Sequence, residues 1–306
     1  MRVLHISLFG KFNVQDECQN PIALDAHKLQ ELFSYLLLNQ DRPHHRERLA
    51  SLLWADNSTV QSKKYLRQAL WQLRNTLDDN RKPENDLLVI DDEWVRFNQD
   101  ASFQLDVDDF EAAYTYVQDT PGSLIDDSTA PILKDAISLY RGDLLEGWYQ
   151  DWCLYPRERL QAMYLSMLHK LMGYCETHKE YQAGINYGQM VLHYDRAQER
   201  IHQQLMRLYY LSGDRSLALR QYQTCVAMLD EELGVLPSRQ TEILYRQMQA
   251  DQFDGVDDMR EGTKAHLAAS LWRLLDSLKQ IRCELDSIQE QLEQHINGMS
   301  TTTTLD

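Results

Sequence analysis

The stretch SKKYLRQALWQLRNTL, residues 62–77, predicts an amphipathic helix that has a cationic flank. At about 100° per residue, one face of this helix is apolar and should be buried; it carries Leu66, Leu70, Leu73 and Leu77. The opposite face is polar except for one tryptophan, and it carries Gln61, Lys64, Gln68, Trp71, Gln72 and Asn75. Three cations lie on a flank, namely Lys63, Arg67 and Arg74, and the stretch contains no Asp or Glu.

These residue types match the chemistry of a DNA-reading surface. Lys and Arg side chains bind guanine edges, Gln and Asn bind adenine edges, and cations hold phosphates. An ordinary solvated helix usually carries acids in i,i+4 pairs with its cations, and this one carries none. A solvated surface helix without a binding role remains the alternative explanation.

The elements around this helix favour the same interpretation. We expect strands at 3–8 and 12–14, helices at 24–40 and 45–56, and a hairpin at 87–98 after the quoted helix. Three helices followed by a hairpin form a winged helix-turn-helix, whose third helix lies in the DNA major groove. Residues 1–99 therefore predict a winged-helix DNA-binding domain. Arg96, in the second half of the hairpin, is a candidate contact of the wing with DNA, or a surface arginine without a special role.

The next segment, residues 106–250, predicts an all-α domain. Helical patterns recur at 107–117, 130–142, 155–178, 181–194, 197–213, 216–234 and 238–248, and residues 118–129 are typical of a loop. A weak repeat aligns Ala183 with Ala218, which is 35 residues later and close to the period of tetratricopeptide-like helix pairs. Small residues at these points would let helices approach closely.

The C-terminal part predicts a linker at 251–265, a coiled-coil helix at 266–296 and a disordered tail at 297–306. Apolar residues recur there at alternating spacings of four and three; they are Leu267, Leu271, Leu274, Leu278, Ile281, Leu285, Ile288 and Leu292. We expect this seam to form a homo-oligomer that places several winged helices near adjacent DNA sites. Packing of the helix back onto its own repeat domain is the alternative.

The net charge of -16 argues against a protein that coats nucleic acid or anionic membranes nonspecifically. Residues 1–98 hold 13 Lys and Arg against 14 Asp and Glu, a net charge of -1, so the remainder carries -15. No apolar run reaches the roughly 18 to 20 residues of a membrane span, and no signal peptide is recognisable. We therefore expect a cytoplasmic protein without a membrane partner. The five cysteines are widely spaced and suggest reduced, buried thiols.

Nothing in the sequence predicts an enzyme or a cofactor. The motifs of a nucleophile elbow, a zinc protease and a dinucleotide fold are all missing. His44 and His45 are adjacent and point to different sides, so surface or capping roles are expected rather than a shared metal. The aromatic segment GWYQDWCLYP, residues 147–156, could line a pocket, but packing between helices is the expected role of Trp148, Trp152 and Tyr155.

Several motifs occur in the order of one known family. They are LASLLWADNSTVQSKKYLRQALWQLRNTL, VRFN, LDVDDFEAA, LYRGDLLEGWYQDWCLYPRERLQAMYL and HQQLMRLYYLSGDRSLALRQYQTCVAMLDEELGVLPS. Over roughly residues 2–248 the chain resembles the bacterial transcriptional activator domain family, which includes the antibiotic regulatory proteins of the streptomycete type. The resemblance implies a winged helix like that of response regulators, a tetratricopeptide-like activator domain, binding to promoter direct repeats and recruitment of RNA polymerase.

The chain departs from the long members of that family because it lacks a G-x-x-x-x-G-K-[ST] nucleotide-binding loop, and the family supplies no role for the heptad segment. Taken together, the sequence predicts a mainly α protein that binds double-stranded promoter DNA and contacts RNA polymerase. Lys64 and Gln68, with Gln61 and Trp71 beside them, are expected to read bases. Lys63, Arg67, Arg74 and Arg96 are expected to neutralise phosphates. The alternative is a helical-repeat scaffold whose winged helix binds no DNA.

Overall fold

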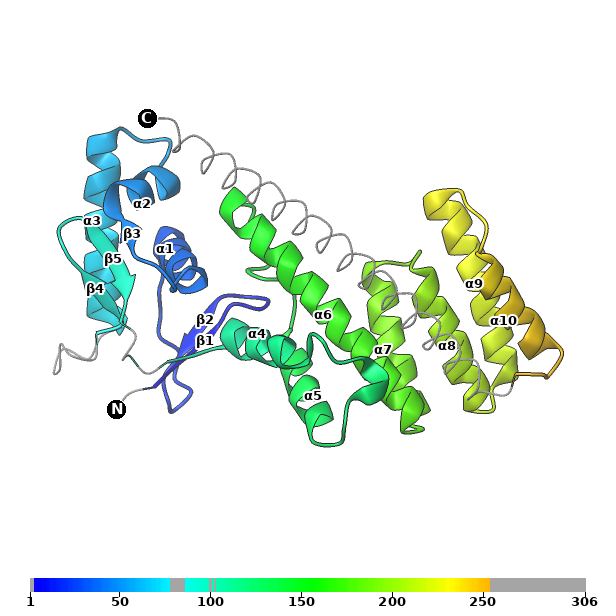
Figure 1. Ribbon diagram of the computed structural model, residues 1–306. Helices are drawn as coiled ribbons and strands as arrows, with labels where there is room; N and C mark the ends of the chain where they lie inside the picture. Colours follow the sequence, from blue (N-terminus) through cyan, green and yellow to red (C-terminus); the bar gives the residue numbers. More distant parts are fainter. Residues whose placement is uncertain (1–2, 78–85, 99–100, 102, 254–306) are drawn as a thin grey trace, which may run out of the picture.

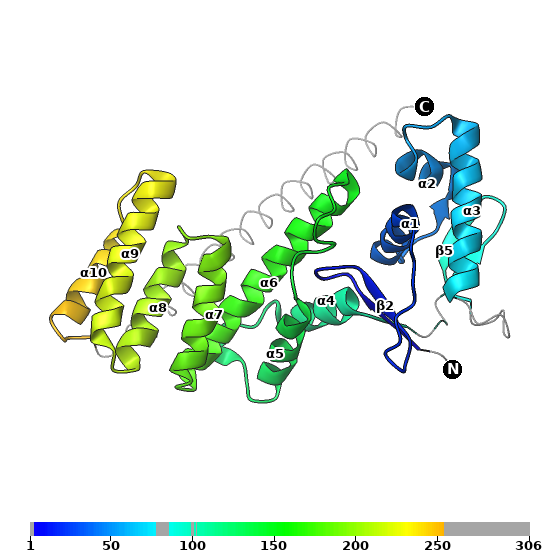
Figure 2. The ribbon, with the colours of Figure 1, turned by 180° about the vertical axis from the view of Figure 1, so that it is seen from behind.

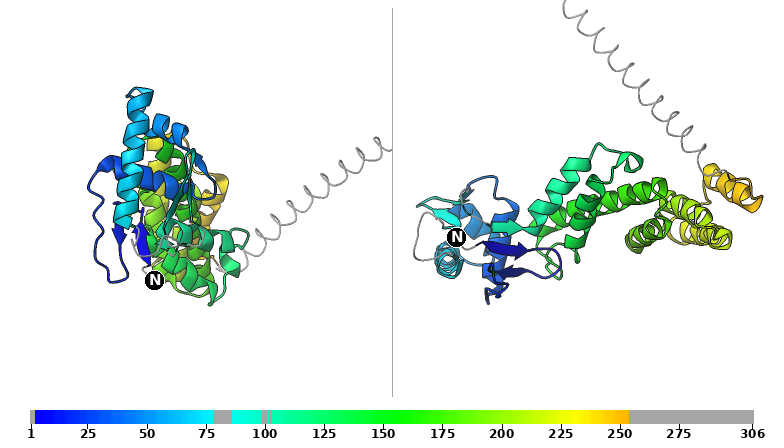
Figure 3. Two further views of the ribbon diagram at one scale, coloured as in Figure 1. Left: turned by 90° about the vertical axis from the view of Figure 1, so that its left-hand side faces the viewer. Right: turned by 90° about the horizontal axis from the view of Figure 1, so that it is seen from below.

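The computed structural model describes residues 3–77, 86–98, 101 and 103–253, and within them the chain is mainly helical and elongated (Figure 1). The winged helix lies at one end, and helices α9 and α10 lie at the other (Figures 2 and 3). The described helices include none that is long and apolar enough to cross a membrane.

The N-terminal part forms the predicted winged helix. Its helices are α1 (His27–Leu38), α2 (Arg46–Leu53) and α3 (Thr59–Leu77). The hairpin consists of β4 (Leu88–Ile90) and β5 (Trp94–Phe97), and β5 also pairs with β3 (His44–His45), which gives an antiparallel sheet in the order β3-β5-β4. Strand β3 was not predicted, because two residues are too short to show the alternating pattern of a strand.

A second sheet connects the two ends of the winged helix to the helical domain. Strand β1 (Leu4–Ser7) pairs antiparallel with β2 (Asn13–Gln15) and parallel with β6 (Phe103–Leu105). The sequence predicted β1 and β2 but not β6, whose residues come directly before the first helix of the next domain. The start of the chain is thus held beside the point at which the helical domain begins.

The remaining described residues form a succession of helices. They are α4 (Asp106–Val117), the 3-10 turn η2 (Gly122–Leu124), α5 (Thr129–Leu139), α6 (Asp151–Thr177), α7 (Tyr181–Tyr194), α8 (Glu199–Leu211), α9 (Arg215–Leu233) and α10 (Arg239–Gln249). From α6 to α10, each helix packs against the next one along the chain, as in tetratricopeptide-like repeats (Figure 1). The predicted all-α domain is therefore present.

One local prediction about these helices was inaccurate, and one close contact was not predicted. Helix α6 begins at Asp151 rather than at 155, because Cys153 is fully buried and Trp152 packs against α1, which holds the chain helical through Pro156. Gly188, which the sequence did not single out, also lets helices approach closely, beside Ala183, which packs against the core, and the fully buried Ala218. A Cβ at Gly188 would lie 2.6 Å from Leu205 Cδ2 of α8 and 2.7 Å from Met172 Cε of α6.

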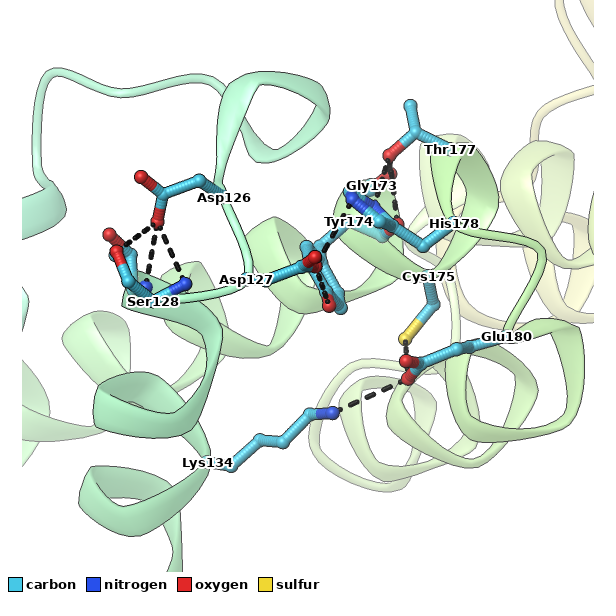
Figure 4. Close-up of polar contacts among 11 residues, drawn as sticks. Asp126, Asp127, Ser128, Lys134, Gly173, Tyr174, Cys175, Thr177, His178 and Glu180 are labelled. Atoms are coloured by element: carbon cyan, nitrogen blue, oxygen red, sulfur yellow. Dashed lines mark hydrogen bonds and ion pairs between the residues drawn. The ribbon is translucent and has the colours of Figure 1, made fainter.

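A polar cluster joins α5 and the residues just before it to the end of α6 and to the turn between α6 and α7 (Figure 4). The Tyr174 hydroxyl donates a hydrogen bond of 2.8 Å to Asp127, and His178 Nε2 lies 3.4 Å from the same carboxylate. Lys134 Nζ lies 3.3 Å from a carboxylate oxygen of Glu180. Such side-chain contacts between neighbouring helices fix their relative rotation.

The winged helix and the helical domain share one continuous hydrophobic core. Phe9, after β1, packs edge-on against Phe110 of α4, with ring centroids 4.9 Å apart. Trp148 stacks on His27 of α1 at 4.7 Å, and Trp152 packs edge-on against Tyr35 at 5.5 Å. The expected packing role is confirmed for the two tryptophans.

The neighbouring Tyr155 does not pack in this way, because its side chain is 73% exposed. Trp148 and Trp152 face α1, whereas Tyr155 lies on a side of α6 that no described helix covers. The prediction of a packing role for Tyr155 was therefore wrong.

Candidate nucleic-acid interface

Helix α3 is held to its domain by its apolar face. The four predicted leucines are buried, and Ala69 is buried beside them. At the start of the helix, Ser62 Oγ donates to the carbonyl oxygen of Trp54 at 2.9 Å, which ties α3 to the end of α2. This attachment fixes the rotation of α3 about its own axis, so that the opposite face points outward.

The outward face presents the residues that the sequence singled out. The side chains of Gln61, Lys64, Gln68, Trp71 and Asn75 are all exposed. Acidic side chains do not occur anywhere in α3. Figures 1 and 2 place α3 at the end of the molecule that is farthest from α10, so no other described helix covers this face.

Two of the three cations on the flank of α3 form ion pairs that the sequence did not indicate. Lys63 forms an ion pair with Glu47 of α2, and Arg74 forms one with Asp86 at 2.5 Å. The hydrogen bond and the charge of Lys63 lower the pKa of Glu47. Sequence analysis missed both acids because they come from other elements. Within the described part of the chain, Lys64 and Arg67 form no ion pair.

Of these two ion pairs, the one between Lys63 and Glu47 lies at the surface, whereas Asp86, the partner of Arg74, is largely buried. The Lys63 and Glu47 side chains are about half exposed or more. Exposed ion pairs contribute little to stability, and solvent and salt compete with them. A phosphate oxygen could therefore replace the carboxylate of Glu47 as the partner of Lys63.

The tip of the wing is acidic. It consists of Asp91, Asp92 and Glu93, between β4 and β5. Backbone N–H groups of Trp94 and Glu93 donate to the Asp91 carboxylate and lower its pKa, which keeps the carboxylate charged. Repulsion between these charges and phosphates disfavours insertion of the tip into a DNA groove. The turn was recognised as acidic from the sequence, but its effect on the wing was not.

Arg96 lies on β5 close to this tip, and its charge contributes to the lowered pKa of Asp91. It is exposed, between the buried Val95 and Phe97. It lines a groove of about 640 Å³ together with Arg42 and with two acids, Asp41 and Asp91. Arg96 and Arg42 are therefore the cations that the body of the wing presents.

A second groove, of about 480 Å³, separates α3 from the tip of the wing. It is lined by His45, Arg46, Glu47, Lys63, Leu66, Arg67, Asp92 and Glu93. The walls carry charges of both signs, and Arg46 donates to the carbonyl oxygen of Asp91 at 2.8 Å. The groove is thus part of the surface that α3 and the wing present together.

The other candidate sites are structural where the structure describes them. His45 caps α2 by accepting from Glu47 N at 3.3 Å, whereas His44 is buried and bonded to Asn39 O, contrary to a surface role. The described residues contain no group of three His, Cys, Asp or Glu that could hold a metal ion. Burial raises the pKa of the Cys153, Cys175 and Cys225 thiols. The linker, the coiled-coil seam and the tail lie outside the described residues.

Comparison with known proteins agrees with this architecture. The family model of the bacterial transcriptional activator domain matches residues 105–249. The fold is similar to that of Mycobacterium tuberculosis EmbR, solved in complex with a low affinity phosphopeptide, with a TM-score of 0.63 and 18% sequence identity. The alignment covers 90% of this chain and 71% of the EmbR chain. No curated protein matches the sequence.

Proposed function

Residues 105–249 form a bacterial transcriptional activator domain, and on this premise we propose that the protein is a sequence-specific DNA-binding activator of transcription. It acts by binding rather than by catalysis and uses no cofactor. Helix α3 enters the major groove of promoter DNA, and the helical domain contacts RNA polymerase. Oligomerisation through residues 266–296 stays a prediction.

The observation that carries this proposal is the outward face of α3. Lys64 and Gln68 lie one turn apart on it and read base edges, and Gln61 extends the same face by one further turn. The shared core gives this face a fixed position relative to the activator domain. No acid of α3 itself opposes the approach of DNA.

The phosphate contacts come from the flank of α3 and from the wing. Arg67 is available without breaking an ion pair, and Lys63 exchanges its exposed carboxylate partner for a phosphate. Arg74, whose side chain is about half exposed, contacts a phosphate while it stays paired with the largely buried Asp86. Arg96 contacts the backbone from the exposed side of β5, and repulsion between phosphates and the nearby acidic tip weakens this contact. Rising salt weakens each of these phosphate contacts, so the affinity for DNA should depend strongly on ionic strength.

The test is fluorescence anisotropy with DNA from the region upstream of the protein's own gene, at two salt concentrations. Gln68→Ala should reduce discrimination at one base pair by about 1–3 kcal/mol. Arg67→Ala should instead weaken binding to all sequences and reduce the salt slope by about one. Equal losses for cognate and scrambled DNA with Gln68→Ala would remove Gln68 from base reading. Absence of selective binding at low salt would reject DNA recognition.

A protein-interaction scaffold is the second candidate, and the acidic tip of the wing is the observation that favours it. Asp91, Asp92 and Glu93 would suit a basic protein partner better than a nucleic acid. The anisotropy experiment separates the two functions, since a scaffold would show no sequence preference.

A further inference from the structure

Trp71 lies on the outward face of α3. Its side chain is 65% exposed. Helical spacing places four polar residues three or four positions away from it, and these are Arg67, Gln68, Arg74 and Asn75. Trp71 is thus the apolar centre of the surface that the proposed function assigns to DNA.

The fold itself does not account for this side chain. Among the described residues, the indole of Trp71 stacks on no other ring and forms no hydrogen bond. By contrast, Trp54 and Trp148 are buried, and Trp152 packs between α6 and α1. A tryptophan that is fully buried removes about 150–250 Å² from water. Because Trp71 is 65% exposed, a partner that covers it would remove most of this area from water.

We propose that Trp71 contacts the 5-methyl group of a thymine in the major groove and so selects thymine at one position of the binding site. This inference rests on the proposed function, since it needs α3 to lie in that groove. The thymine methyl is the apolar group that base pairs present there, and guanine, adenine and cytosine offer only donors and acceptors. The surrounding Gln68 and Asn75 amides cannot make an equivalent apolar contact.

The experiment removes that methyl group and nothing else. The bound sequence is first selected from a random DNA pool with the full chain, and each thymine is then replaced by deoxyuridine. Loss of one buried methyl group should weaken wild-type binding about fourfold at a single position. With Trp71→Ala, the same replacement should have no further effect, because the contact is already gone.

Two matched variants test whether the effect belongs to Trp71. Tyr65→Ala removes another aromatic side chain from α3, which is 39% exposed but lies on a different side of the helix. Gln68→Ala removes a neighbour on the same face. Both should keep the full sensitivity to deoxyuridine, and Trp71→Phe should keep part of it. Circular dichroism checks that each variant folds.

The possible results are distinguishable. If wild-type protein binds selectively but tolerates deoxyuridine at every position, or if the selected site contains no thymine, the role of Trp71 is refuted and DNA recognition stands. Undiminished sensitivity to deoxyuridine in Trp71→Ala also refutes it. If the random pool yields no selective binding, the proposed function fails, and this inference fails with it.

Discussion

Asp106 joins the start of the chain to the first helix of the activator domain. Its carboxylate accepts backbone hydrogen bonds from Leu8 N at 2.9 Å and Phe9 N at 3.0 Å, almost one hundred residues earlier in the sequence. Burial raises the pKa of Asp106 to about 6, although these hydrogen bonds oppose the shift. We therefore expect this one side chain to make the junction of the two domains sensitive to pH.

The free energy of unfolding should reveal this shift. Between about pH 4 and pH 6, the unfolded chain loses the Asp106 proton while the folded chain keeps it, so stability falls as pH rises. The loss should reach about 3 kcal/mol above pH 6. Urea unfolding of wild type and Asp106→Asn across this range measures it as the difference between the two curves, which cancels other titrations. Parallel curves would contradict the prediction.

Helix α3 shows how one element depends on its neighbours. Its leucines fix which face is buried, but the charge on its flank is set by Glu47 of α2 and by Asp86. In the proposed function, Glu47 competes with phosphates for Lys63, so the ion pair between α2 and α3 lowers the affinity for DNA. The net positive charge of this surface is therefore smaller than the residues of α3 alone suggest.

Removing that competitor should strengthen DNA binding. Glu47→Gln leaves Lys63 without its carboxylate partner, so affinity should rise severalfold for cognate and scrambled DNA alike, with a steeper salt dependence. Anisotropy titrations at several salt concentrations measure both effects. Glu232→Gln is the matched control, because it removes the same charge from α9, at the far end of the molecule, beyond the screening length of about 8 Å. A rise with Glu232→Gln as well would show that net charge alone matters.

For the whole molecule, the main consequence comes from the core that the winged helix and the activator domain share. Trp152 of α6 packs on Tyr35 and donates a hydrogen bond of 3.3 Å to Glu31, which is only 2% exposed. Lys28 forms an ion pair with the same carboxylate at 2.7 Å. The activator domain is therefore held at a defined angle to α3.

Calorimetry should show one cooperative unfolding transition for both domains. Trp152→Ala removes a partly buried side chain and a partner of buried Glu31, so it should destabilise the protein, by less than the roughly 3–5 kcal/mol of a fully buried tryptophan, and split the transition in two. Tyr155→Ala is the matched control, since it removes an exposed aromatic side chain one turn along the same helix. Two transitions already in the wild type would show that the domains unfold independently.

The sequence by itself determined the helices, the order of the winged helix and the buried leucines of α3. These features follow from the periodicity of apolar residues, which is a local property of the chain. Only the tertiary structure decided that β6 pairs with β1, that α6 begins at Asp151, and that Glu47 and Asp86 neutralise two cations of α3. Each of these features depends on contacts between residues that are distant in the sequence. Periodicity describes only neighbouring residues, so these contacts become visible only in the folded chain.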